Sequence, residues 1–396
     1  MIAKRASSVG DSITMAITAY AQKLKKEGLD VINFGAGEPD FDTPEFIQES
    51  GIKAIRSGKT RYTAATGILE LKEAVASSLK QDQNLVYTPS QIVISCGAKH
   101  SIFNAMMALI DPGDEVLIPS PYWVSYPDQV HLCGGIPVFI PTSESTAFKI
   151  TAPQLKAAIT PKTKLLILNS PSNPTGSVYT KSELVALAEV ILAHRLLVLS
   201  DEIYEKLVYG NVAHISIASL DPQLQDLTIL VNGLSKAYAM TGWRIGYSAS
   251  PLTIATAMGT IQSHCTSNAN TPSQWAGVDA LIKGDASIAT MRLAFEKRKN
   301  EMVALLNHIP GVHCLNPDGA FYTFPTIASL MGKSCKSGVI KTDADFCQFL
   351  LKEALVACIP GSGFGAEGFI RLSYATSLPD IHTGLSRMKQ WIESLT

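Results

Sequence analysis

The chain has 396 residues, 46% of them hydrophobic, which is enough for two domains or for one large domain with a smaller one. The formal net charge of −1 and the absence of any run of basic residues argue against a nucleic-acid-binding protein. The seven cysteines are dispersed without a Cys-x-x-Cys pair, which argues against a disulfide framework and against a metal site, and indicates a reducing, cytoplasmic environment.

The first elements predicted along the chain are two helices. Ser12 is a suitable N-cap for a helix that runs to about Glu27 and stops at Gly28. Thr43-Pro44 opens a second helix, with the proline at its first helical position. The N-terminus has no apolar signal core, so we expect no targeting segment there.

The middle of the chain alternates short apolar runs with helical patterns. Helices are predicted over residues 98–109 and about 123–132. Strands are predicted over residues 91–95, 115–118, 136–140, 164–168, 196–199, 227–231 and 245–248. Because crossover helices between strands place those strands parallel, this pattern predicts an α/β fold with a mostly parallel sheet flanked by helices.

The longest apolar stretch, residues 184–199, contains Glu189, His194 and Arg195. We therefore expect a buried helix followed by a buried strand, and no membrane association.

The C-terminal part has a different pattern. A long helix is predicted over residues 286–307 and a last helix over about 379–394, with strands near 321–324, 356–359 and 369–373 between them. This pattern predicts a small α+β domain built from both chain ends, residues 1–46 and 286–396. The large domain would then comprise residues 47–285.

One lysine stands out in the segment that follows the predicted strand 227–231. Lys236 lies among small and hydroxyl residues, directly after Ser235 and eight residues before Arg244. Burial would lower its pKa and make it a nucleophilic amine, as a Schiff base with a carbonyl cofactor requires. Ser235 and Arg244 could hold a phosphate beside it, which together suggests pyridoxal phosphate (PLP). A surface lysine is the alternative for this motif taken alone.

Several other polar residues follow predicted strands. Gly97 and Ala98 begin a helix whose free N–H groups could bind an anion, although an ordinary turn explains them equally well. Trp123 could stack on a planar cofactor or belong to the core. Asn173 lies in a Pro- and Gly-rich cluster that turn chemistry alone can explain.

Two charged residues are predicted in buried strands. Asp201, three residues before Tyr204, could pair with a pyridine nitrogen or simply cap a helix, with Glu202 on the surface. Arg371 lies inside an apolar strand and needs an anionic partner, which could be a substrate carboxylate or a structural acid.

These motifs, in this order and spacing, resemble the class I aminotransferases of PLP fold type I. The resemblance covers nearly the whole chain and is closest to the bacterial and plastid branch of aspartate aminotransferases. The motifs that carry it are Ala36 to Phe41, Arg61-Tyr62, Pro121 to Tyr126, Asn173-Pro174-x-Gly176, Asp201-x-x-Tyr204, Ser235-Lys236, Ala239 to Arg244, and Arg371.

The resemblance implies roles for these residues around bound PLP. Lys236 would form the Schiff base and move the substrate proton, while Asp201 would pair with the ring nitrogen. Tyr204 and Asn173 would bond the phenolic oxygen, and Trp123 would stack on the ring. The phosphate would be bound by Gly97, Ala98, Ser235 and Arg244, with Lys99 beside them and Tyr62 of a second subunit completing a homodimeric site. Arg371 would bind the substrate α-carboxylate, with Gly37, Trp123 and Asn173 also near the substrate.

The resemblance also implies a substrate class. Lys99 occupies the position of a lysine that binds the distal carboxylate, and Ser12 and Thr14 match assisting hydroxyls; a solvated lysine and a plain helix cap are the alternatives. The expected reaction is amino transfer from L-aspartate to 2-oxoglutarate. A prephenate or broad aromatic aminotransferase, a PLP-dependent β-lyase, and a PLP-binding regulator are the other possibilities.

Overall fold

A computed structural model describes residues 2–3, 7, 9–10 and 13–396 of the chain. Its largest sheet has the strand order β2-β8-β7-β6-β5-β3-β4. These strands are β2 (Ile92–Ser95), β3 (Glu115–Ser120), β4 (Ile136–Pro141), β5 (Thr163–Asn169), β6 (Leu197–Asp201), β7 (Thr228–Gly233) and β8 (Gly246–Ala249). Only β8 runs antiparallel to its neighbours β2 and β7, and the other neighbouring pairs are parallel. The predicted mostly parallel sheet is confirmed, with one reversed strand that the sequence pattern did not predict.

Burial on both faces explains why these strands read as continuous apolar runs. In β5, Leu165 and Ile167 pack into one hydrophobic cluster, whereas the alternate residues Leu166 and Leu168 pack into another. Successive side chains of a strand point to opposite faces, so both faces of β5 must be covered.

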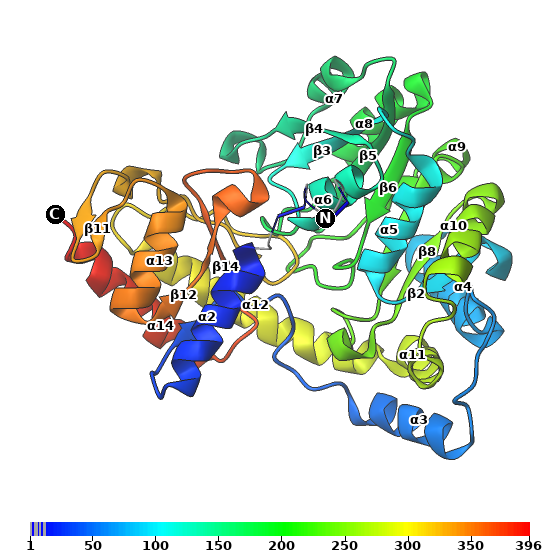
Figure 1. Cartoon of the computed structure of the whole chain (residues 1–396), viewed down its shortest axis with the longest axis horizontal. Helices are drawn as coiled ribbons and strands as arrows, with labels where there is room; N and C mark the ends of the chain where they lie inside the picture. The colour runs from blue at the N-terminus through cyan, green and yellow to red at the C-terminus, as the bar shows by residue number, and fades with distance from the viewer. Residues whose placement is uncertain (1, 4–6, 8, 11–12) are drawn as a thin grey trace.

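Helices provide this cover. The cluster on one face includes residues of α5, α6 and α10, and the clusters on the other face include residues of α4, α7, α8, α9 and α11. Figure 1 shows these helices around the sheet. Their bounds are α4 (Leu69–Gln83), α5 (Ala98–Leu109), α6 (Ser125–Leu132), α7 (Ala152–Ala158), α8 (Lys181–His194), α9 (Pro222–Gln225), α10 (Leu252–Cys265) and α11 (Thr271–Lys283).

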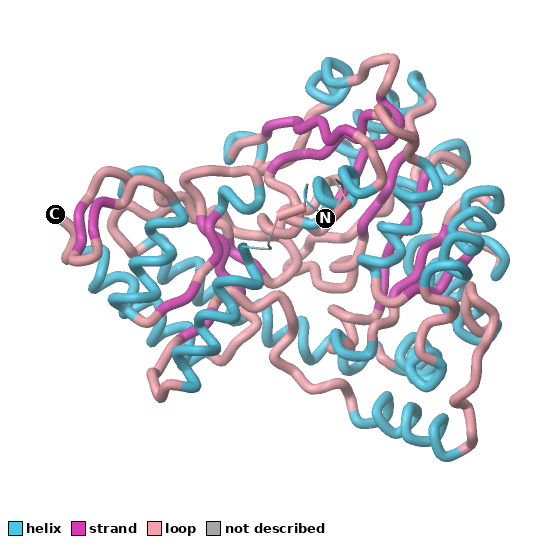
Figure 2. Tube along the Cα trace, viewed as in Figure 1, coloured by secondary structure: helices cyan, strands magenta, loops and turns pink. Residues whose placement is uncertain are grey.

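The two ends of the chain pack together beside this sheet, as Figures 1 and 2 show. Strand β1 (Ile32–Asn33) pairs in parallel with β12 (Val356–Ala357), more than 300 residues later in the chain. A second small sheet has the order β13-β14-β9, from Ile359–Pro360, Ile370–Ser373 and Tyr322–Thr323. The helices here are α2 (Ile13–Lys26), α12 (Asp285–Asn307), α13 (Asp343–Ala354) and α14 (Leu378–Glu393); the hairpin β10–β11 joins Ser334–Cys335 to Gly338–Val339.

The predicted domain boundaries stay a prediction. The largest hydrophobic cluster combines α12, α13 and α14 with residues 203–209, which follow β6 of the large sheet. A continuous core therefore joins the two predicted parts. The first predicted boundary, between residues 46 and 47, falls inside helix α3 (Glu45–Arg56), which lies against α11.

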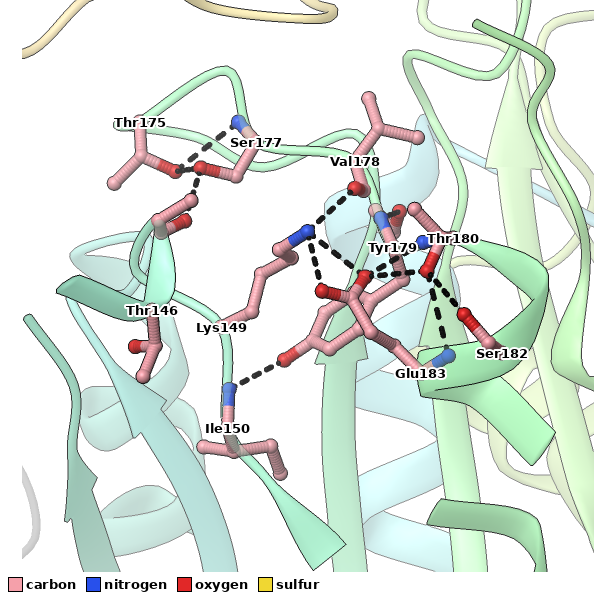
Figure 3. Close-up of polar contacts among 12 residues, drawn as sticks. Thr146, Lys149, Ile150, Thr175, Ser177, Val178, Tyr179, Thr180, Ser182 and Glu183 are labelled. Atoms are coloured by element: carbon pink, nitrogen blue, oxygen red, sulfur yellow. Dashed lines mark hydrogen bonds and ion pairs between the residues drawn. The ribbon is translucent and has the colours of Figure 1, made fainter. Parts of the chain in front are cut away.

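A partly buried ion pair fixes the connection between β4 and α7 against α8 (Figure 3). Lys149 Nζ lies 2.7 Å from Glu183 Oε1 and also donates to the Val178 carbonyl at 3.3 Å. Glu183 is the fourth residue of a capping box that starts at Thr180, so the same carboxylate also accepts a hydrogen bond from the N–H of the N-cap residue Thr180.

Several helix starts differ slightly from the prediction. Pro44 is the N-cap of α3, one position before the first helical residue, and α6 begins at Ser125 instead of Trp123. The predicted cap Ser12 lies outside the described residues. Among the described residues, no helix is both long and apolar enough to cross a membrane.

Candidate active site

A cavity of about 570 Å³ lies where the parallel strands of the large sheet end. Its wall includes residues that follow β3, β5, β6 and β7, together with residues from both chain ends. In open α/β sheets, ligands bind in the crevice at the carboxyl ends of the strands. Of the predicted site residues, the structure brings eleven into this wall: Gly37, Ala98, Lys99, Trp123, Asn173, Asp201, Tyr204, Ser235, Lys236, Arg244 and Arg371.

Lys236 follows β7 and extends into the cavity. Its Nζ donates to the Gly37 carbonyl at 2.5 Å and forms no ion pair with any described carboxylate. Burial lowers the pKa of Lys236 to about 8, with the nearby Glu38 charge opposing this shift and the Arg371 charge adding to it. Lys236 is therefore a cavity amine that loses its proton more readily than an ordinary lysine, as a nucleophile and proton carrier requires.

Asp201, the last residue of β6, is buried with 4% of its surface exposed. Its Oδ2 accepts a 2.6 Å hydrogen bond from Tyr126 Oη, and its Oδ1 accepts one from the Ile203 N–H at 3.2 Å. Burial raises the pKa of Asp201 to about 6, although these two donors favour the carboxylate. The group is thus a carboxylate at neutral pH with one side facing the cavity, suited to a cationic ring nitrogen. Its bond with the Ile203 N–H lies in a turn, no helix begins there and Glu202 is buried, so the alternative of a helix cap beside a surface glutamate is wrong.

Arg371 in β14 is buried, and no described acidic side chain forms an ion pair with it. Its two terminal nitrogens donate to Asn173 Oδ1 and to the Gly35 carbonyl, each at 3.0 Å. Its guanidinium carbon lies 4.4 Å from the ring centroid of Tyr322. The structural ion pair that was the alternative for Arg371 is absent from the described part of the chain, which leaves a positioned cation for an external carboxylate.

The turn before α5 forms a cradle for an anion. Gly97 has a φ of +84°, and a Cβ there would lie 2.4 Å from Arg244 Nη2. Across from it, a Cβ on Gly246 would lie 2.2 Å from the Ala98 nitrogen. Both glycines thus allow backbone and guanidinium groups to converge at a helix N-terminus, the arrangement that binds phosphate. Ser235 borders the same cavity.

Lys99, in the first turn of α5, is a second unpaired cation of the cavity. Its Nζ lies 4.9 Å from the Trp123 ring centroid. Burial lowers the pKa of Lys99, and the Arg244 charge adds to this. Among the described residues no carboxylate pairs with it.

Tyr204 lies on the cavity wall, and its hydroxyl is 2.9 Å from that of Tyr322. Burial raises the pKa of Tyr204, so it is a neutral hydroxyl that can donate a hydrogen bond. Tyr322 comes from β9 in the C-terminal part of the chain, and no sequence motif predicted it.

Two of the predicted residues that the structure describes, Gly97 and Tyr62, are not part of this cavity wall. Tyr62 is 90% exposed on the loop between α3 and α4. Thr14 belongs to α2, but its side chain is outside the described part of the structure, as is all of Ser12. From α2 the structure instead places Ala19 and Gln22 in the wall.

Sequence reasoning missed several wall residues. Tyr126 lies in the quoted segment Pro121 to Tyr126, but nothing in the segment indicates its contact with Asp201. Asn169 donates to the Asp201 carbonyl at 2.9 Å and accepts from the Asn173 N–H. Its place at the end of β5 was a usable signal, because polar residues at strand ends form such crevices.

Comparison with known proteins matches this chain to one family. The family model "Aminotransferase class I and II" matches residues 29–387. An aspartate aminotransferase from Geobacillus stearothermophilus is 49% identical over 393 residues, covering 99% of each chain. The chain belongs to the class I and II aminotransferases.

Two further relatives match this aminotransferase over nearly the whole length of both chains. An aspartate/prephenate aminotransferase from Cereibacter sphaeroides is 46% identical over 98% of both chains. The crystal structure of the aspartate aminotransferase from Rhizobium meliloti superposes with a TM-score of 0.97, at 46% identity over all of both chains. The predicted family and the predicted PLP fold type I are thus confirmed.

PLP is the cofactor of this aminotransferase family, and the cavity residues fit it. A partly neutral lysine, a buried carboxylate and a cradle that two glycines keep open are the groups that an aldehyde, a pyridine nitrogen and a phosphate require.

Proposed function

We propose that this aminotransferase transfers the amino group of L-aspartate to 2-oxoglutarate, giving oxaloacetate and L-glutamate in a ping-pong cycle. The observation that carries the proposal is the charge of the cavity. Arg371 and Lys99 both border it, and neither has an ion-pair partner among the described residues. Lys236 and Arg244 also border the cavity without an ion pair among the described residues, but they would serve the cofactor. The two remaining cations favour a substrate with two carboxylates, and both aspartate and 2-oxoglutarate have two.

Arg371 would bind the α-carboxylate in this proposal. Its contacts with Asn173 and the Gly35 carbonyl hold the guanidinium plane in place before substrate arrives. Lys99 would bind the distal carboxylate, with Trp123 limiting how its flexible chain can move. Ser12 and Thr14 remain proposed assistants of Lys99.

PLP, when bound, supplies an electron sink for the charge that develops at the substrate Cα. Lys236 would be its Schiff-base partner, and its released Nζ would then take the proton from Cα and return it on the cofactor side. Asp201 would hold the ring nitrogen protonated, and Tyr204 and Asn173 would bond the phenolic oxygen. Gly97, Ala98, Ser235 and Arg244 would bind the phosphate, and Trp123 would stack on the ring.

Replacing Lys99 by alanine tests the substrate class. A charge-assisted hydrogen bond typically contributes about 1.5–3 kcal/mol, so kcat/KM for aspartate and 2-oxoglutarate should fall roughly ten- to a hundredfold. Alanine and phenylalanine have no distal carboxylate, so their kcat/KM should change little. PLP affinity, measured on the same variant, separates loss of substrate binding from a defect at the phosphate turn. An equal loss for acidic and neutral substrates would contradict the proposal.

Prephenate is a second candidate substrate, because it also has two carboxylates and the relative from Cereibacter sphaeroides is named for both aspartate and prephenate. Assaying prephenate beside aspartate, tyrosine and phenylalanine decides between a narrow and a broad enzyme. We further propose that the enzyme is a cytoplasmic homodimer, with Tyr62 of each subunit reaching the cofactor phosphate of the other.

A further inference from the structure

The loop that carries Tyr62 is held firmly although Tyr62 itself is exposed. Thr271 Oγ1, at the start of α11, donates to the Arg61 carbonyl at 2.7 Å. At the other end of the loop, the Ile68 N–H donates to Gln274 Oε1 at 2.8 Å. A 90% exposed aromatic side chain on a loop fixed from both sides is preorganised for a contact outside its own chain.

Gln262 of α10 is the central residue that holds this loop. It is fully buried, and its Nε2 donates to the carbonyls of Ala65 at 2.5 Å and of Ile94 at 2.7 Å. Its Oε1 accepts from Ser95 Oγ at 2.7 Å and from Asn104 Nδ2 at 2.9 Å. A primary amide has two donors and two acceptor sites, so Gln262 uses all four.

These four bonds fix the orientation of the amide. A flipped amide would place its NH₂ group against the Asn104 NH₂ group and its oxygen against two carbonyls, which cannot pair. A fully satisfied buried network of this kind is rigid, and it is costly to disturb.

The partners of Gln262 belong to two different parts of the phosphate site. Ile94 and Ser95 end strand β2, directly before the turn at Gly97 that forms the cradle in the same chain. Ala65 lies three residues after Tyr62, in the loop. The Ile94 N–H also donates to the Thr66 carbonyl at 3.0 Å, so the loop follows the edge of the sheet.

We propose that Gln262 is a positioning residue that holds the Tyr62 loop in register with the edge strand β2, so that Tyr62 is presented to the cofactor phosphate of the partner subunit. The inference rests on the proposed function, because it takes PLP as the ligand and a homodimer as the assembly. It predicts that damage at Gln262 of one chain weakens PLP binding in the site of the other chain.

Hybrid dimers with two affinity tags test this prediction. In the trans hybrid, one chain carries Lys236→Ala with Gln262→Met, and its partner is otherwise wild type. Only the partner chain can form the Schiff base. The absorbance of this Schiff base during PLP titration of the apoprotein therefore reports PLP binding at one site. In the cis hybrid, Gln262→Met is placed on the chain that retains Lys236. Tyr62→Phe on the Lys236→Ala chain is the reference for loss of the hydroxyl, and the parental hybrid carries Lys236→Ala alone.

The trans hybrid should bind PLP about tenfold more weakly than the parental hybrid, close to the effect of Tyr62→Phe, because a hydrogen bond to a charged group is lost. Amide hydrogen exchange of Gly67 and Ile68 should also become faster in the variant chain. If the trans hybrid bound PLP as tightly as the parental hybrid, the inference about Gln262 would be wrong, whether or not the cis hybrid bound PLP more weakly. The proposed function would not be affected by that result. A parental hybrid that binds no PLP would overturn the proposed function and the inference with it.

A milder variant covers the case in which Gln262→Met does not fold. Thr271→Val keeps the side-chain shape and removes the hydrogen bond to the Arg61 carbonyl, together with the weaker one that the hydroxyl accepts from Asn268 Nδ2 at 3.3 Å. In the trans arrangement it should also weaken PLP binding severalfold. Asn104→Ala is the matched control, because it removes a donor to the same Gln262 oxygen without contacting the loop. An equal loss from Asn104→Ala in trans would show a general packing defect and overturn the specific role.

Discussion

At Asp201, burial and hydrogen bonding act in opposite directions on one carboxyl group. Burial raises its pKa to about 6, while the hydrogen bond from Tyr126 is the strongest influence that lowers it. Tyr126 is itself buried and packs edge-on against Trp123, with ring centroids 5.3 Å apart. Tyr126 therefore helps to keep Asp201 ionised at the pH where the enzyme must work.

Replacing Tyr126 by phenylalanine should raise the pKa of Asp201 above about 6, because the removed hydroxyl favoured the carboxylate. The acid limb of the kcat–pH profile should shift to higher pH, so the loss of activity should be larger at pH 6 than at pH 9. The pH dependence of kcat for aspartate measures this shift.

Asp201→Asn is the control for this experiment, because an amide does not ionise. It should lower kcat at every pH, by roughly two to four orders of magnitude if about 3–5 kcal/mol is lost with a buried charge pair. A Tyr126→Phe profile with an unshifted acid limb would contradict the role of the hydroxyl.

Lys236 should react as an amine with a pKa near 8. Below that pH the ammonium form dominates and cannot attack an aldehyde, so trapping of PLP by the apoprotein should accelerate with rising pH and level off above about 8. Borohydride reduction followed by mass spectrometry of the Lys236 peptide gives the rate. A midpoint near 10.5, the ordinary value for lysine, would show that burial does not control this amine.

Among the elements, the junction of α5 with β8 decides whether the phosphate cradle exists. Gly246 begins β8 and pairs with Ser95 of β2, so its backbone lies directly against the N-terminus of α5. A Cβ on Gly246 would approach the Ala98 nitrogen to 2.2 Å and the Gly97 carbonyl carbon to 2.3 Å, distances that the backbone must move to relieve.

Gly246→Ala should therefore destabilise the protein by about 1–3 kcal/mol and weaken PLP binding strongly. Chemical denaturation and PLP titration of the apoprotein measure the two effects. Gly242→Ala is the matched control, since a Cβ at Gly242 meets nothing within 4 Å. Equal behaviour of the two variants would show that the cradle does not depend on this close approach.

At the scale of the whole molecule, the exposed side chain of Tyr62 can be reached by another chain. Ile55 of α3 and Leu69 at the start of α4 flank the Tyr62 loop in the sequence, and each is 57% exposed. Exposed apolar side chains of this kind favour an association with another surface. Figure 1 shows α3 at the outer edge of the molecule.

We expect the active enzyme to be at least a homodimer at assay concentration. Sedimentation velocity with PLP absorbance as the signal should show one species of twice the chain mass that carries the activity. Dilution that dissociates the dimer should release PLP, because each site would lose the Tyr62 of its neighbour. A fully active monomer that retains PLP would contradict this arrangement.

Local patterns in the sequence were enough to predict the sheet, its flanking helices and a set of candidate cofactor residues. Continuous apolar runs such as Leu165–Leu168 predict strands buried on both faces, and the polar residues that follow them predict a crevice at the strand ends. These are local signals: a strand and the turn that follows it are set by adjacent residues. Asp201, Lys236 and Asn173 could therefore be placed without coordinates, and the resemblance to a family assigned their roles.

Contacts between residues that are far apart in the sequence depend on how the elements pack. The direction of β8 depends on pairing with β2 and β7, not on its own residues. Arg371 reaches Asn173 across 198 residues, and Gln262 reaches Ala65 across 197. A buried arginine or glutamine is costly unless partners converge on it, and those partners come from elements that packing alone brings together. Nothing near such a residue in the sequence specifies them, so their contacts emerge only when the chain has folded.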